Sequence, residues 1–446
     1  MIVRKGTATG ADSHRDKPWA GHAKGSQGYR GVLIGLAAAG VATFAQLYSV
    51  QGVLPGIAAD LDISAASAAL TVSAATLGLA AAVIPWSAAA DRFGRLPVMR
   101  LAIIAAVILG LLVPFSPNLP VLLILRFAEG AAMGGIPAVA LAYLNEEVSR
   151  AHAAVAAGSY VSGTTIGGLA GRLVAAPVAD AADWRVGVGV VSLLAAGAGI
   201  TFMLTAPKQR GFAPLRRSDP GPGLGGRLLA NLRNPRQLSL YLQGFLLMGG
   251  FVTVYNYLGF RLGAAPFSLP QSVASFLFLA YLAGTWSSRS AGVLAVRLGT
   301  RGGRKTVLLG SIAVMAAGLV LTLAAWLPAV IAGLVVFTAG FFAAHSIASG
   351  WAPFLATEGR AQSSSLYNLF YYAGSSLLGW VGGIFFQLAG WAGLSAFVAV
   401  LMVLAAATAA MVLSPEPGTD SSGAHTGPPA GPSGGPAGAA RPPSEP

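Results

Sequence analysis

The chain has 446 residues, of which 55% are hydrophobic and only 10% are charged, and its formal net charge at pH 7 is +13. A mean hydropathy of +0.68 excludes an ordinary soluble protein of this length, which would need far more polar surface. The absence of cysteine excludes disulfides and thiolate metal sites.

Continuous apolar runs of about 20 residues recur along the chain, which is the length that a helix needs to cross a hydrocarbon core roughly 30 Å thick. A membrane β-barrel would instead show alternating segments of about 10 residues. We therefore predict an all-α membrane protein with twelve transmembrane helices. The expected spans are 31–55, 64–88, 97–115, 119–143, 151–176, 184–206, 237–261, 270–292, 303–326, 328–350, 361–389 and 391–413.

The segment 207–236 is basic and rich in Gly and Pro, and it divides the expected spans six and six. This indicates two pseudo-symmetric six-helix bundles, 31–206 and 237–413, joined by a cytoplasmic linker. The N-terminal segment 1–30 is polar and has no apolar core of a signal peptide. The C-terminal segment 414–446 is dominated by Pro, Gly, Ser and Ala, so we expect both tails to be disordered and cytoplasmic.

Basic residues concentrate on one side of the predicted membrane. Every Lys and Arg except Arg126, Arg172, Arg185 and Arg261 falls in the tails, in the linker, or in or within a few residues of a loop on the same side. Because positive loops stay in the cytoplasm, both termini should be cytoplasmic. We expect a multi-pass monomer in the lipid bilayer of a bacterial cytoplasmic (inner) membrane. The spread of the charges over many loops disfavours nucleic-acid binding.

Glycines recur at matched positions in the two halves, which indicates an internal duplication. Gly130 and Gly340 form one such pair, in the fourth and tenth spans. Two glycine triplets, in the fifth and eleventh spans, share one constant offset: Gly163, Gly168 and Gly171, and Gly374, Gly379 and Gly382.

The loop between the second and third spans, "AADRFGRLPVMR", carries four charges between apolar runs. It resembles the signature loop of the major facilitator superfamily, although Ser87 and Ala89 replace a glycine and a leucine of that pattern. A second copy, "GVLAVRLGTRGGRK", has Val296 where the acid would stand. The resemblance implies a gating loop that latches the inner face while the outer face is open. Its matching residues are Asp91, Arg92, Gly94 and Arg95, and, in the second copy, Gly292, Arg297 and Gly299.

The fourth span contains "LILRFAEGAAMGG", in which Arg126 and Gly130 resemble a second signature of the same superfamily. A charge at membrane depth costs about 2.5 to 3.5 kcal/mol, so Arg126 needs a partner or a task. Glu129 lies three residues later on the same helical face. The pair is either structural, or it couples transport to protons with Glu129 as the carrier. His345 in the tenth span is a further proton-coupling candidate, because histidine titrates near neutral pH.

The fifth span, "GSYVSGTTIGGLAGR", is similar in position to the glycine-rich fifth helix of the drug/proton antiporter branch, but it lacks that branch's Gly-Pro pair. Small residues at this spacing let two helices approach closely. Arg172 either snorkels to the headgroups or has a direct role in transport. The candidate packing residues are Gly163, Gly167, Gly168, Gly171 and Arg172.

Polar and aromatic residues in the first, seventh and eleventh spans are candidates for the substrate cavity, which the resemblance places between the two bundles. Each of these side chains can alternatively serve in helix packing. The candidates are Gln46, Tyr48, Gln51, Tyr255, Asn256, Tyr257, Tyr367 and Asn368.

No phosphate-binding loop, H-E-x-x-H metal motif or nucleophile cluster is present, so we expect neither an enzyme nor a metal site. The stretches "LYSVQGVLP" and "GGLAGR" resemble the bacterial sugar and drug efflux permeases. This implies a secondary active transporter that works by alternating access, with proton-coupled efflux of a drug-like or sugar-like small molecule and no cofactor beyond the proton gradient. A proton-coupled importer and a non-transporting membrane sensor remain as alternatives.

Overall fold

The computed structural model describes residues 19–212, 224–299, 302–356 and 359–413. Within these residues the regular elements are helices, and one isolated bridge joins His22 to Val148. The first half contains α1 Gln27–Leu47, η1 Gln51–Val53, α2 Leu54–Asp60, α3 Ala65–Phe93, α4 Arg95–Leu112, η2 Val113–Phe115, α5 Leu119–Met133, α6 Ala140–Glu147, η3 Arg150–His152, α7 Ala153–Ala181 and α8 Trp184–Thr205.

The second half is built in the same way. It contains α9 Leu224–Arg233, α10 Pro235–Gly263, α11 Gln271–Ser275, η4 Phe276–Ala280, α12 Tyr281–Arg297, α13 Gly303–Leu321, α14 Leu327–Leu355 and α15 Arg360–Val412. The last of these holds two helices, because Ala389 and Gly390 have non-helical backbone angles in its interior. The chain therefore crosses the molecule twelve times, as predicted.

Short polar side chains begin several of these helices. Ser64, Asn118 and Asp183 each accept a hydrogen bond from a backbone N–H three residues later. Such N-caps satisfy donors that the first helical turn leaves free. The long apolar segments that follow then form α3, α5 and α8.

Several crossings are interrupted helices. The first breaks after Leu47 and continues as α2, the fourth is divided into α5 and α6, and the eighth starts as α11 and η4 before α12. By length and composition, eight stretches of the described residues qualify as membrane spans. The divided fourth and eighth crossings and α7 are outside that set, and α15 counts in it once although it crosses twice.

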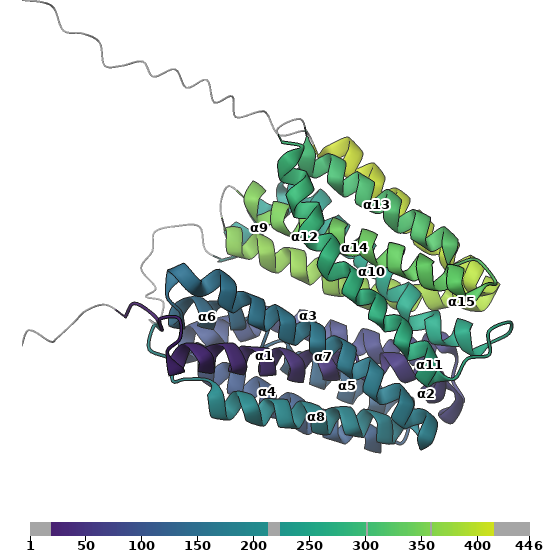
Figure 1. The fold of residues 1–446 in the computed structure, drawn as a ribbon, viewed down its shortest axis with the longest axis horizontal. Coiled ribbons are helices and arrows are strands. Elements are labelled where there is room, and N and C mark those ends of the chain that lie inside the picture. Colours follow the sequence, from purple (N-terminus) through teal and green to yellow (C-terminus); the bar gives the residue numbers. More distant parts are fainter. Residues whose placement is uncertain (1–18, 213–223, 300–301, 357–358, 414–446) are drawn as a thin grey trace, which may run out of the picture.

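The crossings form two bundles, α1 to α8 and α10 to α15 (Figure 1). We call the end where α1 begins and α15 finishes the tail end, and the opposite end the far end. The bundles meet near α2 and α11 at the far end and diverge toward α6 and α9 at the tail end. The described residues thus form a structure that is closed at one end.

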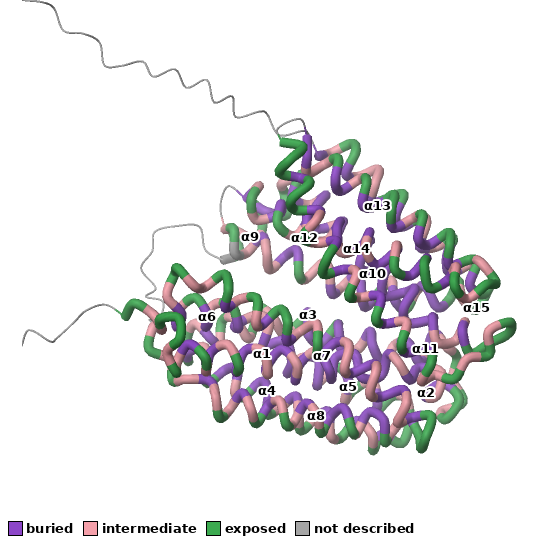
Figure 2. The backbone as a smooth tube through the Cα atoms, viewed as in Figure 1, coloured by how far each residue is buried: buried purple, intermediate pink, exposed green. Residues whose placement is uncertain are grey.

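The outer faces of the bundles are apolar. On α4, Leu101, Ile104 and Ile108 are 58%, 49% and 54% exposed, and they share one face of the helix. Figure 2 shows exposed positions along the outer surfaces and buried positions between the helices. Large apolar side chains over whole helix faces are suited to contact with lipid rather than water.

Parts of the expected N-terminal tail and of the expected linker are ordered in the structure. Residues 19–26 pack against α6, where the Trp19 indole N–H donates to the Glu146 carbonyl (3.1 Å) and the His22 N–H donates to the Glu147 carbonyl (2.7 Å). The segment 207–236 includes α9 and the start of α10. The expected disorder over 1–18 and 414–446 lies outside the described residues.

Candidate functional site

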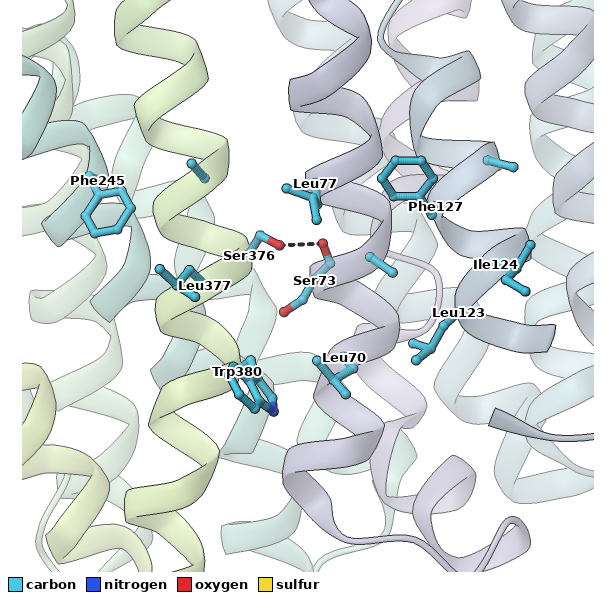
Figure 3. Close-up of a pocket in the computed structure, with 13 residues that line it drawn as sticks. Leu70, Ser73, Leu77, Leu123, Ile124, Phe127, Phe245, Ser376, Leu377 and Trp380 are labelled. Carbon is cyan, nitrogen blue, oxygen red and sulfur yellow. Dashed lines mark hydrogen bonds between the residues drawn. The ribbon is translucent and has the colours of Figure 1, made fainter. Parts of the chain in front are cut away.

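Two of the pockets formed by the described residues lie between the bundles. The larger, of about 710 Å³, is a groove between α3 and α5 on one side and α10 and α15 on the other (Figure 3). Its walls are mostly apolar, and its polar contact is a hydrogen bond of 2.7 Å from the Ser376 hydroxyl to the Ser73 carbonyl. None of its lining residues is charged, so it offers little for recognising a polar molecule.

The smaller space is a cavity of about 190 Å³ between α1 and α7 of the first bundle and α12, α14 and α15 of the second. It combines aromatic walls with a few hydroxyls and one charge, which is the usual composition of a ligand site. Its lining residues are Phe44, Tyr48, Thr164, Thr165, Gly168, Leu169, Arg172, Tyr281, Thr285, Phe342 and Tyr371.

Arg172 is the charged group of this cavity and is 1% exposed. Its guanidinium donates to the Gly168 carbonyl (2.5 Å), the Gln51 side-chain oxygen (2.7 Å) and the Tyr281 hydroxyl (3.3 Å). The same group lies over the Tyr48 ring, 4.0 Å from the centroid. Arg172 therefore points inward between the bundles and does not snorkel toward the headgroups.

A chain of side chains connects Arg172 to the second bundle. Gln51 accepts from Arg172 and donates to the Asn256 side-chain oxygen at 2.6 Å. The Asn256 side-chain nitrogen is buried, and no protein acceptor lies within hydrogen-bond distance of it. Among the expected cavity residues, the structure thus brings Gln51 and Asn256 together, with Tyr48 beside them beneath Arg172.

Three other cavity candidates do not line this cavity, although the Tyr255 ring centroid is 4.8 Å from that of the lining residue Tyr281. Gln46 donates to the Ala106 carbonyl (3.3 Å) inside the first bundle, and Tyr255 bonds to the Thr338 hydroxyl (2.6 Å) inside the second. Tyr257 packs on the Phe386 ring at 5.2 Å. None of the three lines the 190 Å³ cavity.

His345 lies beside the cavity. Its Nδ1 is 3.0 Å from the Tyr367 hydroxyl, and its ring centroid is 4.9 Å from that of Tyr371, which lines the cavity. Asn368, one turn from Tyr371, is exposed. His345 is therefore separated from the cavity by one aromatic neighbour.

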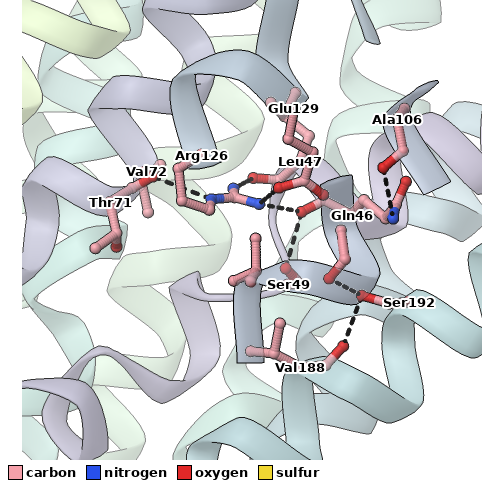
Figure 4. Close-up of polar contacts among 12 residues, drawn as sticks. Gln46, Leu47, Ser49, Thr71, Val72, Ala106, Arg126, Glu129, Val188 and Ser192 are labelled. Carbon is pink, nitrogen blue, oxygen red and sulfur yellow. Dashed lines mark hydrogen bonds and ion pairs between the residues drawn. The ribbon is translucent and has the colours of Figure 1, made fainter. Parts of the chain in front are cut away.

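Arg126 and Glu129 form an ion pair of 2.5 Å in the interior of the first bundle, where Arg126 is 0% and Glu129 1% exposed (Figure 4). Arg126 also donates to the carbonyls of Leu47 (2.7 Å), Gln46 (3.1 Å) and Thr71 (3.2 Å). Leu47 and Gln46 lie in the last turn of α1, where a helix leaves carbonyls without intrahelical donors. Arg126 therefore stabilises the break in the first crossing.

The charged loop stays within its own bundle. Arg95 forms an ion pair with Asp91 and donates to the Glu146 carboxylate at 3.0 Å. Gly94, with φ of +98°, ends α3 in a conformation that favours glycine. The Arg92 guanidinium lies over the neighbouring Phe93 ring at 5.2 Å.

The second copy of the loop pattern begins in the last turns of α12, which hold Gly292 and Arg297, and runs on to the start of α13. Gly299 has φ of +59°, and Gly292 has no neighbour within 4 Å of the place where a Cβ would stand. Arg297 lines a separate surface hollow with Arg289. Val296 stands where Asp91 stands in the first copy. The second copy therefore cannot form an equivalent of the ion pair between Asp91 and Arg95.

The glycines of α7 permit close contact with α1. A Cβ on Gly163 would lie 2.2 Å from the Ala37 carbonyl oxygen, and a Cβ on Gly171 would lie 2.2 Å from that of Ala45. Gly167 meets Val41 in the same way, at 2.6 Å. Gly168 instead faces the Arg172 guanidinium, so this helix combines close packing with the cavity wall.

The family model of the Major Facilitator Superfamily matches residues 36–300. The chain belongs to this superfamily. The inner membrane transport protein YnfM of Escherichia coli (strain K12) is 38% identical over 382 residues, which cover 86% of this chain and 90% of YnfM. The MFS-type transporter YybF of Bacillus subtilis (strain 168) is 35% identical over 382 residues, which cover 86% of this chain and 93% of YybF.

Solved structures agree on the fold. A bacterial homolog of the human lysosomal transporter Spinster, inward-facing and unoccupied, matches with a TM-score of 0.70 and 17% identity, over 86% of this chain and 97% of that one. The nucleoside transporter NupG matches with a TM-score of 0.70 and 13% identity, over 86% of this chain and all of its own. The protein is therefore a membrane transporter with twelve transmembrane helices in two bundles, and the predicted family and fold class are confirmed.

Proposed function

We propose that this transporter exports a small molecule from the cytoplasm in exchange for protons, by alternating access to the 190 Å³ cavity. One observation carries the alternating-access part of the proposal, namely that the bundles meet near α2 and α11 at the far end and diverge toward α6 and α9 at the tail end (Figure 1). The resemblance of "LYSVQGVLP" and "GGLAGR" to bacterial efflux permeases supports the export direction. Among the described residues, the hydrogen-bonded pairs between the bundles include Gln51 with Asn256, Arg172 with Tyr281, Gly56 with Gln271, Asp180 with Gln271 and Ser272, and Ser73 with Ser376. Breaking this set while closing the tail end would expose the cavity to the other side.

The proposed orientation places the tail end in the cytoplasm of a bacterial inner membrane, because the basic loops lie at that end. Reporter fusions at Ser218 and Ser421 test it. Both fusions should give the cytoplasmic signal, and a signal from outside at either site would contradict the orientation.

Proton coupling rests on two ionisable groups inside the membrane part, Glu129 and His345. Such groups are rarely kept at membrane depth without a function. His345 is adjacent to a cavity residue, whereas Glu129 faces Gly110 within the first bundle and is held by Arg126. We propose that His345 carries the coupled proton, and Glu129 is the second candidate for this role.

Proteoliposomes that contain the purified chain test the coupling. A panel of small organic anions, cations and neutral sugars is added under an imposed pH gradient, and internal pH is followed with a trapped dye. An exporter that exchanges protons accumulates substrate when the lumen is acidic, whereas a proton-coupled importer accumulates it when the lumen is alkaline.

The variant His345→Gln should abolish gradient-driven accumulation and retain exchange of substrate at equilibrium. Glu129→Gln is measured beside it, and the variant that loses accumulation identifies the carrier. Binding without flux for every panel compound would contradict transport and favour a sensor.

A further inference from the structure

Arg172 is a buried cation whose charge no carboxylate neutralises. The ion pairs among the described residues join Asp91 and Glu146 to Arg95, Glu129 to Arg126, and Asp60 to Arg185, and none includes Arg172. Its acceptors are a carbonyl, an amide oxygen and a phenol, all of them neutral. A lone charge at membrane depth is costly, so an anionic ligand would stabilise Arg172 where no protein carboxylate does.

The guanidinium also has hydrogen-bonding capacity to spare. Of the five N–H groups of an arginine, three of those of Arg172 have protein acceptors. Each terminal nitrogen thus keeps one further hydrogen. A carboxylate can accept from both terminal nitrogens at once, in the bidentate geometry that arginine favours.

The walls around this charge suit a compact apolar body. Phe44, Tyr48, Tyr281, Phe342 and Tyr371 supply aromatic rings, and three threonines supply hydroxyls. The volume of about 190 Å³ lies below the range of about 300 to 1,000 Å³ for drug-sized ligands, and a cavity of about 150 Å³ is large enough for benzene. The cavity therefore fits a single ring with a small substituent.

We propose that the substrate is a small monovalent carboxylate with a body about the size of one aromatic ring, whose carboxylate binds Arg172. The inference rests on the proposed function, in which this cavity is the transport site. A neutral molecule would leave Arg172 unpaired, and a cation would be repelled. A dianion would leave a net negative charge in the membrane.

The second half of the chain contains no second cation at the equivalent place. At the offset that relates Gly171 to Gly382, Gly383 stands where Arg172 would be repeated. In the structure the Gly383 backbone packs against the Tyr257 hydroxyl and Ala66. The site thus provides one positive charge, which matches one carboxylate.

Equilibrium binding of radiolabelled benzoate to the full-length chain in detergent, at pH 7, tests the proposal. Benzamide has nearly the same shape without the charge, and benzylamine carries the opposite charge. Unlabelled benzoate should displace radiolabelled benzoate at a concentration at least tenfold lower than benzamide or benzylamine requires. Arg172→Gln should weaken benzoate binding at least tenfold, whereas Arg172→Lys should keep part of it.

Arg185→Gln is the matched control, because Arg185 lies outside the cavity and pairs with Asp60. It should bind benzoate as the unmodified chain does. Equal displacement by benzamide, unchanged binding in Arg172→Gln, or no benzoate binding at millimolar concentration would overturn the proposal. If Arg172→Gln does not fold, the comparison of benzoate with benzamide on the unmodified chain still decides.

The two proposals fail separately. Proton-driven transport of a neutral or cationic compound, with no benzoate binding, would overturn the carboxylate inference and leave the proposed function standing. Benzoate binding without proton-linked flux would overturn the proposed function and leave the binding site standing.

Discussion

Arg126 and Arg172 are both fully buried, yet their surroundings assign them different tasks. Arg126 has a carboxylate partner in Glu129 and three backbone carbonyls, so its charge and most of its donors are satisfied. Arg172 has only neutral acceptors and faces a cavity. We therefore assign Arg126 to the stability of the first bundle and Arg172 to the substrate.

Removing Arg126 should destabilise the protein even when Glu129 is removed with it. Arg126→Met leaves a buried carboxylate unpaired, which typically costs about 3 to 5 kcal/mol. In the double variant with Glu129→Met the charge is gone, but the Leu47 carbonyl still loses its donor. Thermal unfolding in detergent, followed by tryptophan fluorescence, should show both variants below the unmodified chain. A double variant with the original melting temperature would reduce the role of Arg126 to neutralising Glu129.

At the scale of elements, α7 and α1 pack through glycines whose neighbours are backbone atoms. A backbone carbonyl cannot rotate away as a side chain can, so an added methyl group must separate the helices. The α10 and α15 pair repeats the arrangement, since a Cβ on Gly374 would lie 2.1 Å from the Phe245 carbonyl oxygen. Close packing through glycine therefore joins the first and fifth crossings of one half and the equivalent seventh and eleventh crossings of the other.

Gly171→Ala should lower the melting temperature by several degrees, because the new methyl group would meet the Ala45 carbonyl oxygen at 2.2 Å. The matched control is Gly158→Ala on the same helix, where nothing lies within 4 Å. That control should be neutral or stabilising by about 0.5 to 1 kcal/mol, since alanine favours the helix. Equal effects of the two changes would show that close packing of α7 on α1 is not needed.

The sequence predicted the number of crossings, because each crossing requires a long apolar run whatever its neighbours. It did not predict the break after Leu47, which depends on donors from Arg126 on another helix. Gly130 and Gly340 share nearly the repeat offset, but Gly130 meets Ala75 on α3 while Gly340 meets Met315 on α13. These two glycines stand at nearly equivalent positions of the two halves, but they contact helices that are not equivalent.

The sequence also did not predict toward which bundle each candidate cavity residue points. Most of α10 is buried all round, so hydropathy gives no preferred side for Tyr255, Asn256 or Tyr257. The contacts of each side chain determine its direction instead. Asn256 is hydrogen-bonded to Gln51 of the first bundle, whereas Tyr255 and Tyr257 contact side chains of the second bundle. The sequence also could not predict that Tyr281 accepts a hydrogen bond from Arg172, because the two residues are far apart along the chain.

At the scale of the whole molecule, the proposed cycle requires the contact between the bundles at the far end to open once per turnover. Asp180 at the end of α7 accepts from the Ser272 backbone N–H at 2.8 Å, and this contact joins α7 to α11. The contact is exposed, so it can exchange with water at little cost. It therefore suits a gate better than a permanent seal.

Fixing this contact should stop transport. The chain has no native cysteine, so Asp180→Cys with Ser272→Cys introduces the only two thiols. A short bifunctional thiol reagent should abolish flux in proteoliposomes, and a reducible linker should allow recovery with dithiothreitol. Benzoate should still bind from the tail side. The single-cysteine variants are controls, and full flux after complete cross-linking would contradict alternating access through the far end.

In the proposed cycle, the charge of Arg172 also sets how the membrane voltage acts on transport. A substrate-occupied site would be neutral, because the carboxylate cancels the guanidinium, whereas the substrate-free site would return with the guanidinium charge and the charge of the coupled proton. Switching the substrate-free site back toward a negative cytoplasm would then move positive charge down the electrical gradient. A potential of 100 mV supplies about 2.3 kcal/mol per elementary charge that crosses it fully. Collapsing the voltage with valinomycin and potassium, at constant pH gradient, should therefore slow the return of the substrate-free carrier and lower the rate of export.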